Sequence, residues 1–328
     1  MKVLLCVRQD YYRNFASDSM QVMQIAKYLK KLGVIFDINN GETVDYSSYD
    51  IIHLFNLNST GEIYKYYKIA HHYRKTIVVS PNYWDLSRYY DYVGDIEGLK
   101  LWRRCKPYRD EILKKCNIIF CNSNIEKEHL KKEFGYNAPC KIIHYGVNAQ
   151  NDDIPLYNFK ERYMLDKYIL CVGRICEIKN QYVLAKICSE MGIELILIGN
   201  VEDGKYFKKC MKFKNVKYFG FMDSYNIYNA YRFAKVHVNC SFAEMPGLSS
   251  LEAAASGCTV VSTEEGCSYE YFKDMAIYND PYDEEDIFNA INKGLQMKKS
   301  TRLKNYITNN FSWKKYCGRI YEYYMQLL

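Results

Sequence analysis

The sequence has no apolar run of 18 or more residues, no Cys-x-x-Cys pair and only six prolines. Without a long apolar run, no segment is predicted to cross a membrane as a helix. The 13 cysteines are an odd number, and their spacing predicts neither a zinc site nor a disulfide framework. Cysteines within apolar segments, such as Cys6, Cys121, Cys171 and Cys240, are expected to be reduced and buried.

The first residues do not read as a signal peptide. A lysine stands at the second position, and the apolar run at residues 3–7 is too short for a signal-peptide core. Residues 2–7 fit a first buried strand better. We therefore expect a cytoplasmic protein.

Positive charge is concentrated in the first half of the chain. Residues 1–150 carry 22 Lys and Arg against 16 Asp and Glu, whereas the remainder carries 23 against 22. This excess of +6 indicates either an anionic partner or membrane surface on that side, or a solvated surface without a partner. An anionic partner would allow peripheral contact with the inner face of a membrane.

Short strand-like segments alternate with helical ones in two successive series. The first series has strands at 2–7, 34–38, 51–55, 76–79, 117–121 and 141–143, with helices at 17–32, 62–73 and 125–134. The second has strands at 168–172, 194–198, 216–219, 236–239 and 260–261, with helices at 180–190, 206–211, 224–233, 248–255, 283–297 and 313–328. Residues 81–110 are less regular, and residues 145–166 are interpreted as a linker.

This alternation predicts an α/β protein of two doubly wound, Rossmann-like domains, because strand–helix–strand units close by right-handed crossovers into parallel sheets. The expected domains are 1–150 and 151–312. Ligands bind such sheets at the carboxyl ends of the strands, so a cleft between the two domains is expected.

One candidate site lies at residues 239–263. It combines Glu244, the helix-breaking Pro246–Gly247 pair, a helix start at 248 and Glu252. A helix N-terminus attracts phosphate, and carboxylates accept hydrogen bonds from hydroxyls, so this segment suits a sugar or a nucleotide. Alternatively, Ser249-x-x-Glu252 is a capping box and Glu244 a solvated carboxylate.

A second candidate segment follows the strand at 168–172. Gly173 permits a tight turn, and Arg174 and Lys179 lie on the strand–loop–helix edge, where two cations suit a diphosphate. Surface charge is the alternative. The two segments occupy equivalent strand edges. We therefore favour one binding site formed by both segments over the two alternatives, a helix cap at Glu252 and surface charge at Arg174 and Lys179.

These motifs resemble the retaining glycosyltransferases of family 4 (glycosyl transferases group 1), which have the GT-B fold. In the C-terminal half the resemblance rests on Glu244-x7-Glu252 with Pro246–Gly247–Leu248 and Ala253…Gly257, and on Gly173–Arg174…Lys179–Asn180. In the N-terminal half it rests on Ala16–Ser17–Asp18–Ser19…Gln21, His53–Leu54–Phe55–Asn56 and Cys121–Asn122–Ser123.

The resemblance implies a UDP- or GDP-sugar held mainly by the C-terminal domain, with no further cofactor. It implies that Arg174 and Lys179 hold the diphosphate, that Glu244 contacts sugar hydroxyls, and that these three are catalytic. The implied donor-binding set is Gly173, Arg174, Lys179, Glu244, Pro246, Gly247, Leu248, Ser249 and Glu252, the last on the ribose. It also implies that the helix at 313–328 crosses back to the N-terminal domain.

The chain departs from the family pattern on the acceptor side. Ala16–Ser17 replaces a glycine pair, and Ser80–Pro81–Asn82–Tyr83–Trp84 replaces a segment with a histidine close to the reacting sugar. Candidates for acceptor-side roles are Ser17, Asn82, His53 and His144, although a lone histidine at a strand end is more often structural. The sequence contains no Asp-x-Asp, the motif by which many glycosyltransferases hold a metal, so the resemblance implies metal-independent transfer.

The leading hypothesis is therefore retaining sugar transfer to a glycan, lipid-linked or protein acceptor. The cluster of Lys100, Trp102, Arg103, Arg104 and Lys106 suits a lipid phosphate or an anionic membrane. Nucleic acid is not expected, because no recognition motif accompanies this cluster. The alternatives are a non-catalytic two-domain protein that binds sugar or nucleotide, and a nucleotide-sugar epimerase of similar fold.

Overall fold

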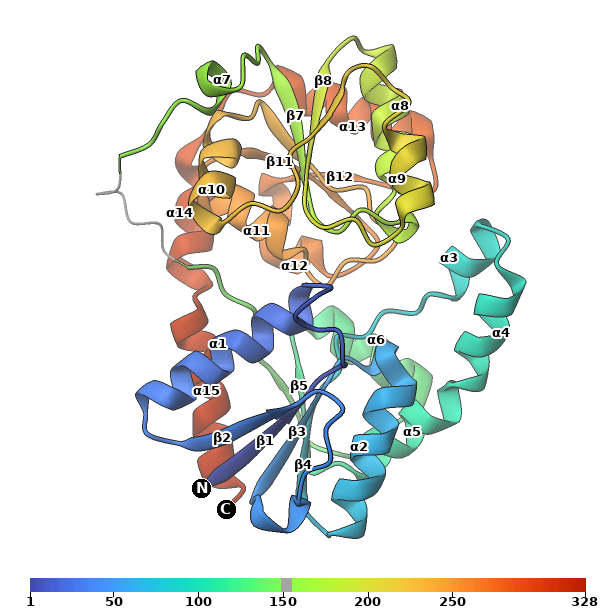
Figure 1. Ribbon diagram of the computed structural model, residues 1–328, viewed down its shortest axis with the longest axis vertical. Helices are drawn as coiled ribbons and strands as arrows, with labels where there is room; N and C mark the ends of the chain where they lie inside the picture. Colours follow the sequence, from blue (N-terminus) through green and yellow to red (C-terminus); the bar gives the residue numbers. More distant parts are fainter. Residues whose placement is uncertain (149–154) are drawn as a thin grey trace. The chain divides into compact units, whose positions relative to one another are not determined.

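The computed structural model describes residues 1–148 and 155–328, which form two compact units (Figure 1). The first unit comprises Met1–Gly146 and Trp313–Leu328, and the second comprises Val147–Ser312. The domain boundary expected at 150/151 lies outside the described residues, as does part of the expected linker.

The first unit is built on a six-stranded parallel sheet with the order β2-β1-β3-β4-β5-β6. Its strands are β1 (Lys2–Cys6), β2 (Ile35–Asn39), β3 (Ile51–Phe55), β4 (Thr76–Ser80), β5 (Ile118–Cys121) and β6 (Cys140–Ile142). Its helices are α1 (Ser17–Lys31), α2 (Thr60–His72), α3 (Ser87–Tyr92), α4 (Ile96–Arg104), α5 (Lys106–Lys115), α6 (Asn124–Phe134) and α15 (Trp313–Gln326). The central strands are almost completely buried, as expected for a parallel sheet covered on both faces.

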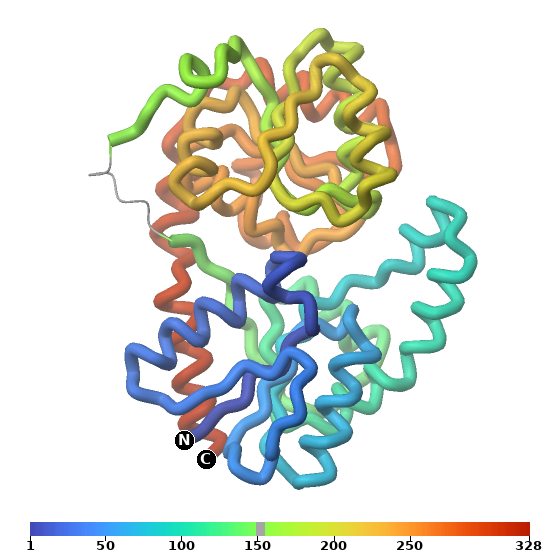
Figure 2. The backbone as a smooth tube through the Cα atoms, in the orientation of Figure 1, coloured from blue at the N-terminus to red at the C-terminus, as the bar shows by residue number. Residues whose placement is uncertain are grey.

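The C-terminal helix α15 belongs to the first unit, which confirms the expected return crossing. It packs against α1, which crosses it obliquely in Figure 2. Its Tyr316 hydroxyl accepts a hydrogen bond from Gln21 of α1, and its Tyr324 hydroxyl lies 2.5 Å from Nδ1 of His53 on β3. Both tyrosines are buried, so the last helix is part of this unit's core.

The second unit repeats the architecture with a parallel sheet of order β12-β11-β10-β7-β8-β9. Its strands are β7 (Tyr168–Val172), β8 (Glu194–Ile198), β9 (Val216–Tyr218), β10 (Val236–Val238), β11 (Thr259–Thr263) and β12 (Ile277–Asn279). Its helices are α7 (Phe159–Arg162), α8 (Gln181–Glu190), α9 (Gly204–Cys210), α10 (Ser224–Phe233), α11 (Leu248–Ala255), α12 (Ser268–Phe272), α13 (Glu284–Gln296) and α14 (Thr301–Asn310).

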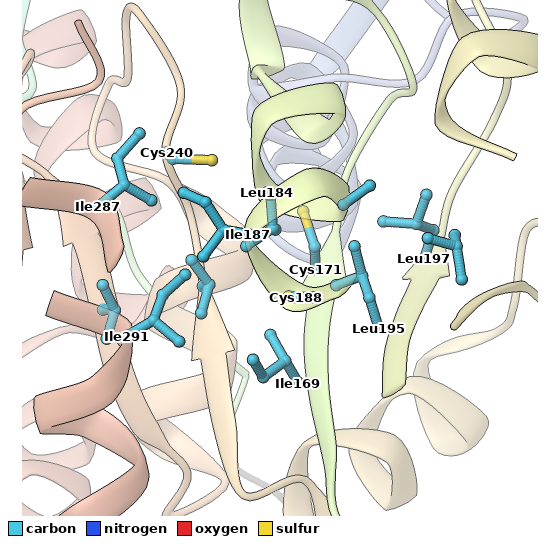
Figure 3. Close-up of a cluster of buried hydrophobic side chains, with 14 of the residues drawn as sticks. Ile169, Cys171, Leu184, Ile187, Cys188, Leu195, Leu197, Cys240, Ile287 and Ile291 are labelled. Carbon is cyan, nitrogen blue, oxygen red and sulfur yellow. The ribbon is translucent and has the colours of Figure 1, made fainter. Parts of the chain in front are cut away.

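Helices α8 and α13 pack on one face of this second sheet. Figure 3 shows their apolar side chains, among them Leu184 and Ile291, meeting Ile169 and Leu195 of the strands. Cys171 and Cys188 lie in the same cluster as small apolar groups, reduced as expected. This core fixes the positions of β7 and β8, and therefore the points from which the loops after them leave the sheet.

The segment 81–110 is more regular than expected, since it forms α3, α4 and part of α5. These short helices depend on tertiary contacts: the buried guanidinium of Arg109 lies 3.7 Å from the Trp102 ring centroid, and Trp102 donates to Asp85 at 2.9 Å. The edge strand β12 and the helices α7, α12 and α14 were also not expected. β12, α7 and α12 have five residues or fewer, too few for a clear hydrophobic period.

No helix within residues 1–148 and 155–328 combines the length and the apolar character needed to cross a bilayer.

Candidate active site

The second unit's sheet has its topological switch point between β7 and β10. From there the chain builds outward to β8 and β9 on one side and to β11 and β12 on the other. In open parallel sheets the loops that leave the strands at such a point form the ligand site. Both sequence-predicted segments are these loops, because one follows β7 and the other follows β10. The fold therefore brings the two candidate segments to one place.

An ion pair joins the two loops. Nζ of Lys179 lies 2.5 Å from Oε2 of Glu244, and the side chains are 20% and 12% exposed. Nδ2 of Asn239 donates to the same carboxylate oxygen at 3.0 Å. Burial by itself raises the pKa of Glu244, but the charge of Lys179 and hydrogen bonds from Lys179, Asn239 and Ser241 hold that pKa below its ordinary value. Glu244 is therefore ionised at neutral pH and able to accept from hydroxyl groups.

Arg174 lies at the start of the first loop and is held by a residue that the sequence interpretation missed. Its Nη1 lies 2.5 Å from Oε2 of Glu202, and its side chain is 27% exposed. The carbonyl oxygen of Arg174 accepts from Nε2 of Gln181 at 2.7 Å, which ties the loop to the start of α8. A guanidinium has five N–H donors, so the pair with Glu202 leaves donors for an anion.

Two glycines outside the predicted set allow the loops to approach each other's backbones. A Cβ on Gly199 would lie 2.0 Å from the carbonyl oxygen of Gly173, and a Cβ on Gly266 would lie 1.9 Å from that of Glu244. The Glu244 backbone pairs with this second segment: its N–H donates to Glu265 at 3.0 Å, and its carbonyl accepts from Cys267 at 3.2 Å. Gly199 directly follows the strand expected at 194–198, and Gly266 comes shortly after the strand expected at 260–261. A glycine at or just after a strand end is the sequence signal that could have identified both residues.

Helix α11 presents an open N-terminus beside Glu244. Gly247 is its N-cap in a left-handed conformation, and no side chain among the described residues caps the helix. Leu248 and Ser249, its first two residues, are partly exposed, whereas Pro246 and Gly247 are buried. Free N–H groups and the positive end of the helix dipole are a binding site for an anion.

The capping-box alternative is wrong. Because Gly247 is the N-cap and the helix begins at Leu248, Glu252 lies two residues beyond the position from which a capping-box glutamate bonds the N-cap amide. Its side chain is partly buried and has no hydrogen-bond partner among residues 1–148 and 155–328. Burial raises the pKa of Glu252 to about 7. A carboxyl group in this setting gains from a hydroxyl that donates to it.

Two of the acceptor-side candidates are enclosed in the core of the first unit. His53 is fully buried, with Tyr324 at Nδ1 and Ser80 at 2.8 Å from Nε2, and burial lowers its pKa well below the ordinary value. Asn82 is also buried: Nδ2 donates to Gln21 at 3.0 Å, and Oδ1 accepts from Tyr145. His53 is therefore a structural, neutral histidine, and Asn82 is held in a side-chain network.

Ser17 and His144 remain closer to the surface. Ser17 is the partly exposed first residue of α1, and His144 is partly exposed in the segment after β6. The next residue, Tyr145, hydrogen-bonds Asn82, so the segment that carries His144 crosses from the sheet edge toward the loop after β4.

A buried ion pair that the sequence interpretation missed lies at the switch point of the first sheet, between β1 and β3. Nε of Arg8 lies 2.7 Å from Oδ2 of Asp18, and Nδ2 of Asn56 donates to the same oxygen at 2.9 Å. Arg8 follows β1 and Asn56 follows β3, so this network is the first unit's counterpart of the Lys179–Glu244 pair.

Within the described ranges, no group of three or more His, Cys, Asp or Glu side chains is arranged to hold a metal ion.

Both halves of the chain match known protein families. Residues 157–311 match the model described as glycosyl transferases group 1, and residues 21–151 match the model described as glycosyltransferase family 4. Among curated protein sequences, none matches this chain.

Solved glycosyltransferase structures share the fold over the whole chain. Sucrose-phosphate synthase from Thermosynechococcus elongatus aligns with a TM-score of 0.82 at 15% identity, over 100% of this chain and 99% of that one. HepE from Anabaena, in complex with UDP and glucose, aligns with a TM-score of 0.79 at 14% identity, over 99% and 100%. The lipopolysaccharide outer core galactosyltransferase WaaB aligns with a TM-score of 0.67 at 13% identity, over 100% of both chains.

Proposed function

The chain belongs to the family 4 glycosyltransferases with the GT-B fold, and we propose that it transfers a sugar, with retention, from a UDP- or GDP-sugar bound by its second unit. The observation that carries the donor site is the pair Lys179–Glu244 at the switch point, next to the uncapped start of α11. A cation, an ionised carboxylate and a helix N-terminus together suit a ligand that has both phosphates and hydroxyls.

In this proposal the donor's diphosphate lies between Arg174, Lys179 and the first N–H groups of α11. These groups stabilise the negative charge that develops on the leaving nucleoside diphosphate. The charge is in place before the reaction, because Glu202 orients Arg174 and Glu244 orients Lys179. We assign no protein nucleophile; the leaving phosphate takes the proton of the acceptor hydroxyl.

The two carboxylates have different tasks. Glu244 is ionised and held by Lys179 and Asn239, so it accepts from hydroxyls of the donor sugar. Glu252 lacks a partner among the described side chains and accepts from the ribose hydroxyls. An Asp or Glu bound to sugar hydroxyls contributes through charge-assisted hydrogen bonds, which are about twice as strong as neutral ones.

The acceptor is a glycan, a lipid-linked sugar or a protein, bound by the first unit. A lipid-linked acceptor or an anionic membrane is supported by α4, which exposes Ile96 and Leu101 at 64% and 58% next to Lys100, Arg103 and Arg104. Figure 1 shows α3 and α4 extending away from this unit's sheet. Apolar side chains flanked by cations are typical of a helix that lies at a membrane surface.

The test is donor binding by the purified protein. It is incubated with UDP-, GDP- and ADP-sugars, and both the melting temperature and slow donor hydrolysis are measured. We expect stabilisation by UDP- or GDP-sugars, lost in Arg174→Ala and Glu244→Ala. Arg302→Ala is the control for Arg174→Ala, because Arg302 pairs with Asp274 on the exposed surface of the same unit.

The outcomes separate the hypotheses. If no nucleotide sugar changes the melting temperature, the donor-site assignment is wrong. Stabilisation without hydrolysis or transfer to any acceptor would support a non-catalytic binding protein. Interconversion of the sugar on an intact nucleotide would support an epimerase.

A further inference from the structure

Two cysteines approach each other at the edge of the first sheet. Sγ of Cys121 on β5 lies 3.2 Å from Sγ of Cys140 on β6. In the β5–β6 ladder Cys140 is opposite Ile119 and Cys121 is opposite Ile142, so the two thiols lie diagonally on the same face. β6 is the edge strand and begins at Cys140, so the backbone there is held by a strand on one side only.

The environment of Cys140 is basic. An open pocket of about 530 Å³ is lined by Cys140 together with Lys127, Lys131, Gly135, Tyr136, Asn137 and Ala138. Lys127 and Lys131 are one turn apart on α6 and carry the charge of this pocket. This pocket has room for a small electrophile or peroxide beside Cys140, which is partly exposed, and its lysines favour the thiolate.

The two thiols differ in protonation. A hydrogen bond from Cys121, aided by the Tyr136 hydroxyl and the charge of Lys127, lowers the pKa of Cys140 to about 7 against the effect of burial. Burial raises the pKa of Cys121 well above the ordinary value. Glu126 is the nearby acidic group, and burial raises its pKa to about 8, so it adds little negative charge at neutral pH. Cys140 is thus the thiol of the pair that ionises more readily, and its thiolate accepts a hydrogen bond from the Cys121 thiol.

The remaining cysteines do not share this arrangement. Eleven of the 13 are buried, and Cys105 is the other partly exposed thiol. Cys105 lies between α4 and α5 and serves as an internal reference for a surface cysteine of this protein.

We propose that Cys140 is a peroxide-sensitive site that closes a disulfide with Cys121. The Cys140 thiolate attacks one oxygen of the peroxide, the O–O bond breaks, and sulfenic acid forms with release of hydroxide or alkoxide. The Cys121 sulfur then attacks the Cys140 sulfur, the S–O bond breaks, and the thiol proton leaves with the hydroxyl group as water. Two thiols lose two electrons in total, and the peroxide is reduced.

Disulfide closure shortens the sulfur–sulfur separation by about 1.2 Å, because a disulfide bond is about 2.05 Å long. The start of the edge strand supplies this movement. The disulfide ties the beginning of β6 to the end of β5, and β6 leads directly into the segment with His144 and Tyr145.

The experiment treats the intact, reduced protein with hydrogen peroxide and quenches the samples in acid. The remaining thiols are then blocked with iodoacetamide in denaturant at mildly alkaline pH, and peptides are mapped by mass spectrometry. We expect a peptide that links Cys121 to Cys140, with Cys105 still alkylated. In Cys121→Ser, dimedone should trap Cys140 as sulfenic acid. In Cys140→Ser, Cys121 should stay reduced, and Cys105→Ser should leave the linkage unchanged.

A second measurement does not depend on disulfide closure. We expect iodoacetamide to label Cys140 about fivefold faster than Cys105 at pH 7, because the larger thiolate fraction outweighs its lower nucleophilicity. Lys127→Gln should slow this labelling. The proposal is overturned if Cys140 reacts no faster than Cys105, or if peroxide oxidises Cys105 or links protein molecules before any Cys121–Cys140 peptide appears.

Discussion

Lys179 and Glu244 are 65 positions apart in the sequence, yet their charged groups meet at 2.5 Å. The pair joins the loop after β7 to the loop after β10 and is mostly shielded from water. It therefore has two roles in the proposed site: it orients each group toward the donor, and it keeps the carboxylate ionised.

Removing either partner should impair both activity and stability. We expect Lys179→Ala and Glu244→Ala each to lower turnover about 100-fold or more, since each group acts on the charge or position of the donor. Each single variant also leaves a shielded charge without its partner, which should cost about 1–3 kcal/mol of unfolding free energy. Steady-state kinetics and urea unfolding measure the two effects.

The double variant provides the control for coupling. If the double variant loses less stability than the two single variants lose in sum, the two residues interact. Lys186 and Glu284 form a matched surface pair at 2.6 Å, with both side chains more than a third exposed, and its coupling should stay below about 1 kcal/mol. Equal coupling in the two pairs would contradict a special role for Lys179–Glu244.

Gly266→Ala should displace the Glu244 backbone. The added Cβ would lie 1.9 Å from the Glu244 carbonyl oxygen. The backbones of Glu244 and Gly266 pair with each other, so this clash acts directly on the Glu244 loop. We expect weaker donor binding and a loss of turnover of about tenfold or more, since catalysis is sensitive to misplacement by about 1 Å. The control is Gly192→Ala, which also has a positive φ but meets no atom within 4 Å. Donor binding that is equally affected by both changes would point to general strain.

Glu252 predicts a pH dependence with a definite sign. Its pKa is raised from an ordinary 4.5 to about 7 by burial, so the folded protein binds the proton more tightly than the unfolded chain. Its contribution to stability is therefore favourable at low pH and is lost as the pH rises from about 4.5 to about 7. The loss is of the order of 3 kcal/mol, because each tenfold difference in proton affinity between the folded and unfolded chain corresponds to about 1.4 kcal/mol.

The measurement compares the unfolding free energies of the wild type and Glu252→Gln between pH 4 and pH 9. The pKa of Glu126 is also raised, but Glu126 contributes equally to both curves. The difference between the two curves therefore contains only the contribution of Glu252 to the pH dependence. We expect Glu252→Gln to gain relative stability toward high pH, whereas exposed Glu190→Gln should follow the wild type. A difference curve that is flat between pH 4.5 and 7 would show that Glu252 is solvated.

Transfer should not need a divalent metal. Arg174, Lys179 and the start of α11 supply the positive charge that a metal supplies to the diphosphate in other glycosyltransferases. We expect EDTA to leave the initial rate of transfer within about twofold of the untreated enzyme, and added Mg²⁺ or Mn²⁺ to have a similarly small effect, compared with the roughly 100-fold that one charge-stabilising donor supplies. Loss of activity in EDTA that is restored by a metal would overturn this mechanism.

The amino-acid sequence by itself determined the class of fold. Alternating buried strands and amphipathic helices left a parallel, doubly wound sheet as the arrangement for each half, and both sheets are of this kind. It also placed Arg174, Lys179 and Glu244 at strand ends, because the residue that follows a buried strand is readable from local pattern. Ser123 directly precedes α6 and caps it, since its Oγ accepts from the Glu126 amide at 3.0 Å.

The tertiary structure decided which of these side chains meet, and what each can do. His53 looks like a functional histidine in its own strand, but Tyr324, 271 positions later, packs against it and makes it part of the core. Glu252 has the sequence spacing of a capping box with Ser249, but the structure makes Gly247 the N-cap, so Glu252 lies two residues beyond the capping position. Glu202 and Gly266 gain their roles from loops that follow other strands, β8 and β11. Such contacts depend on how distant segments pack, and local sequence patterns do not encode that packing.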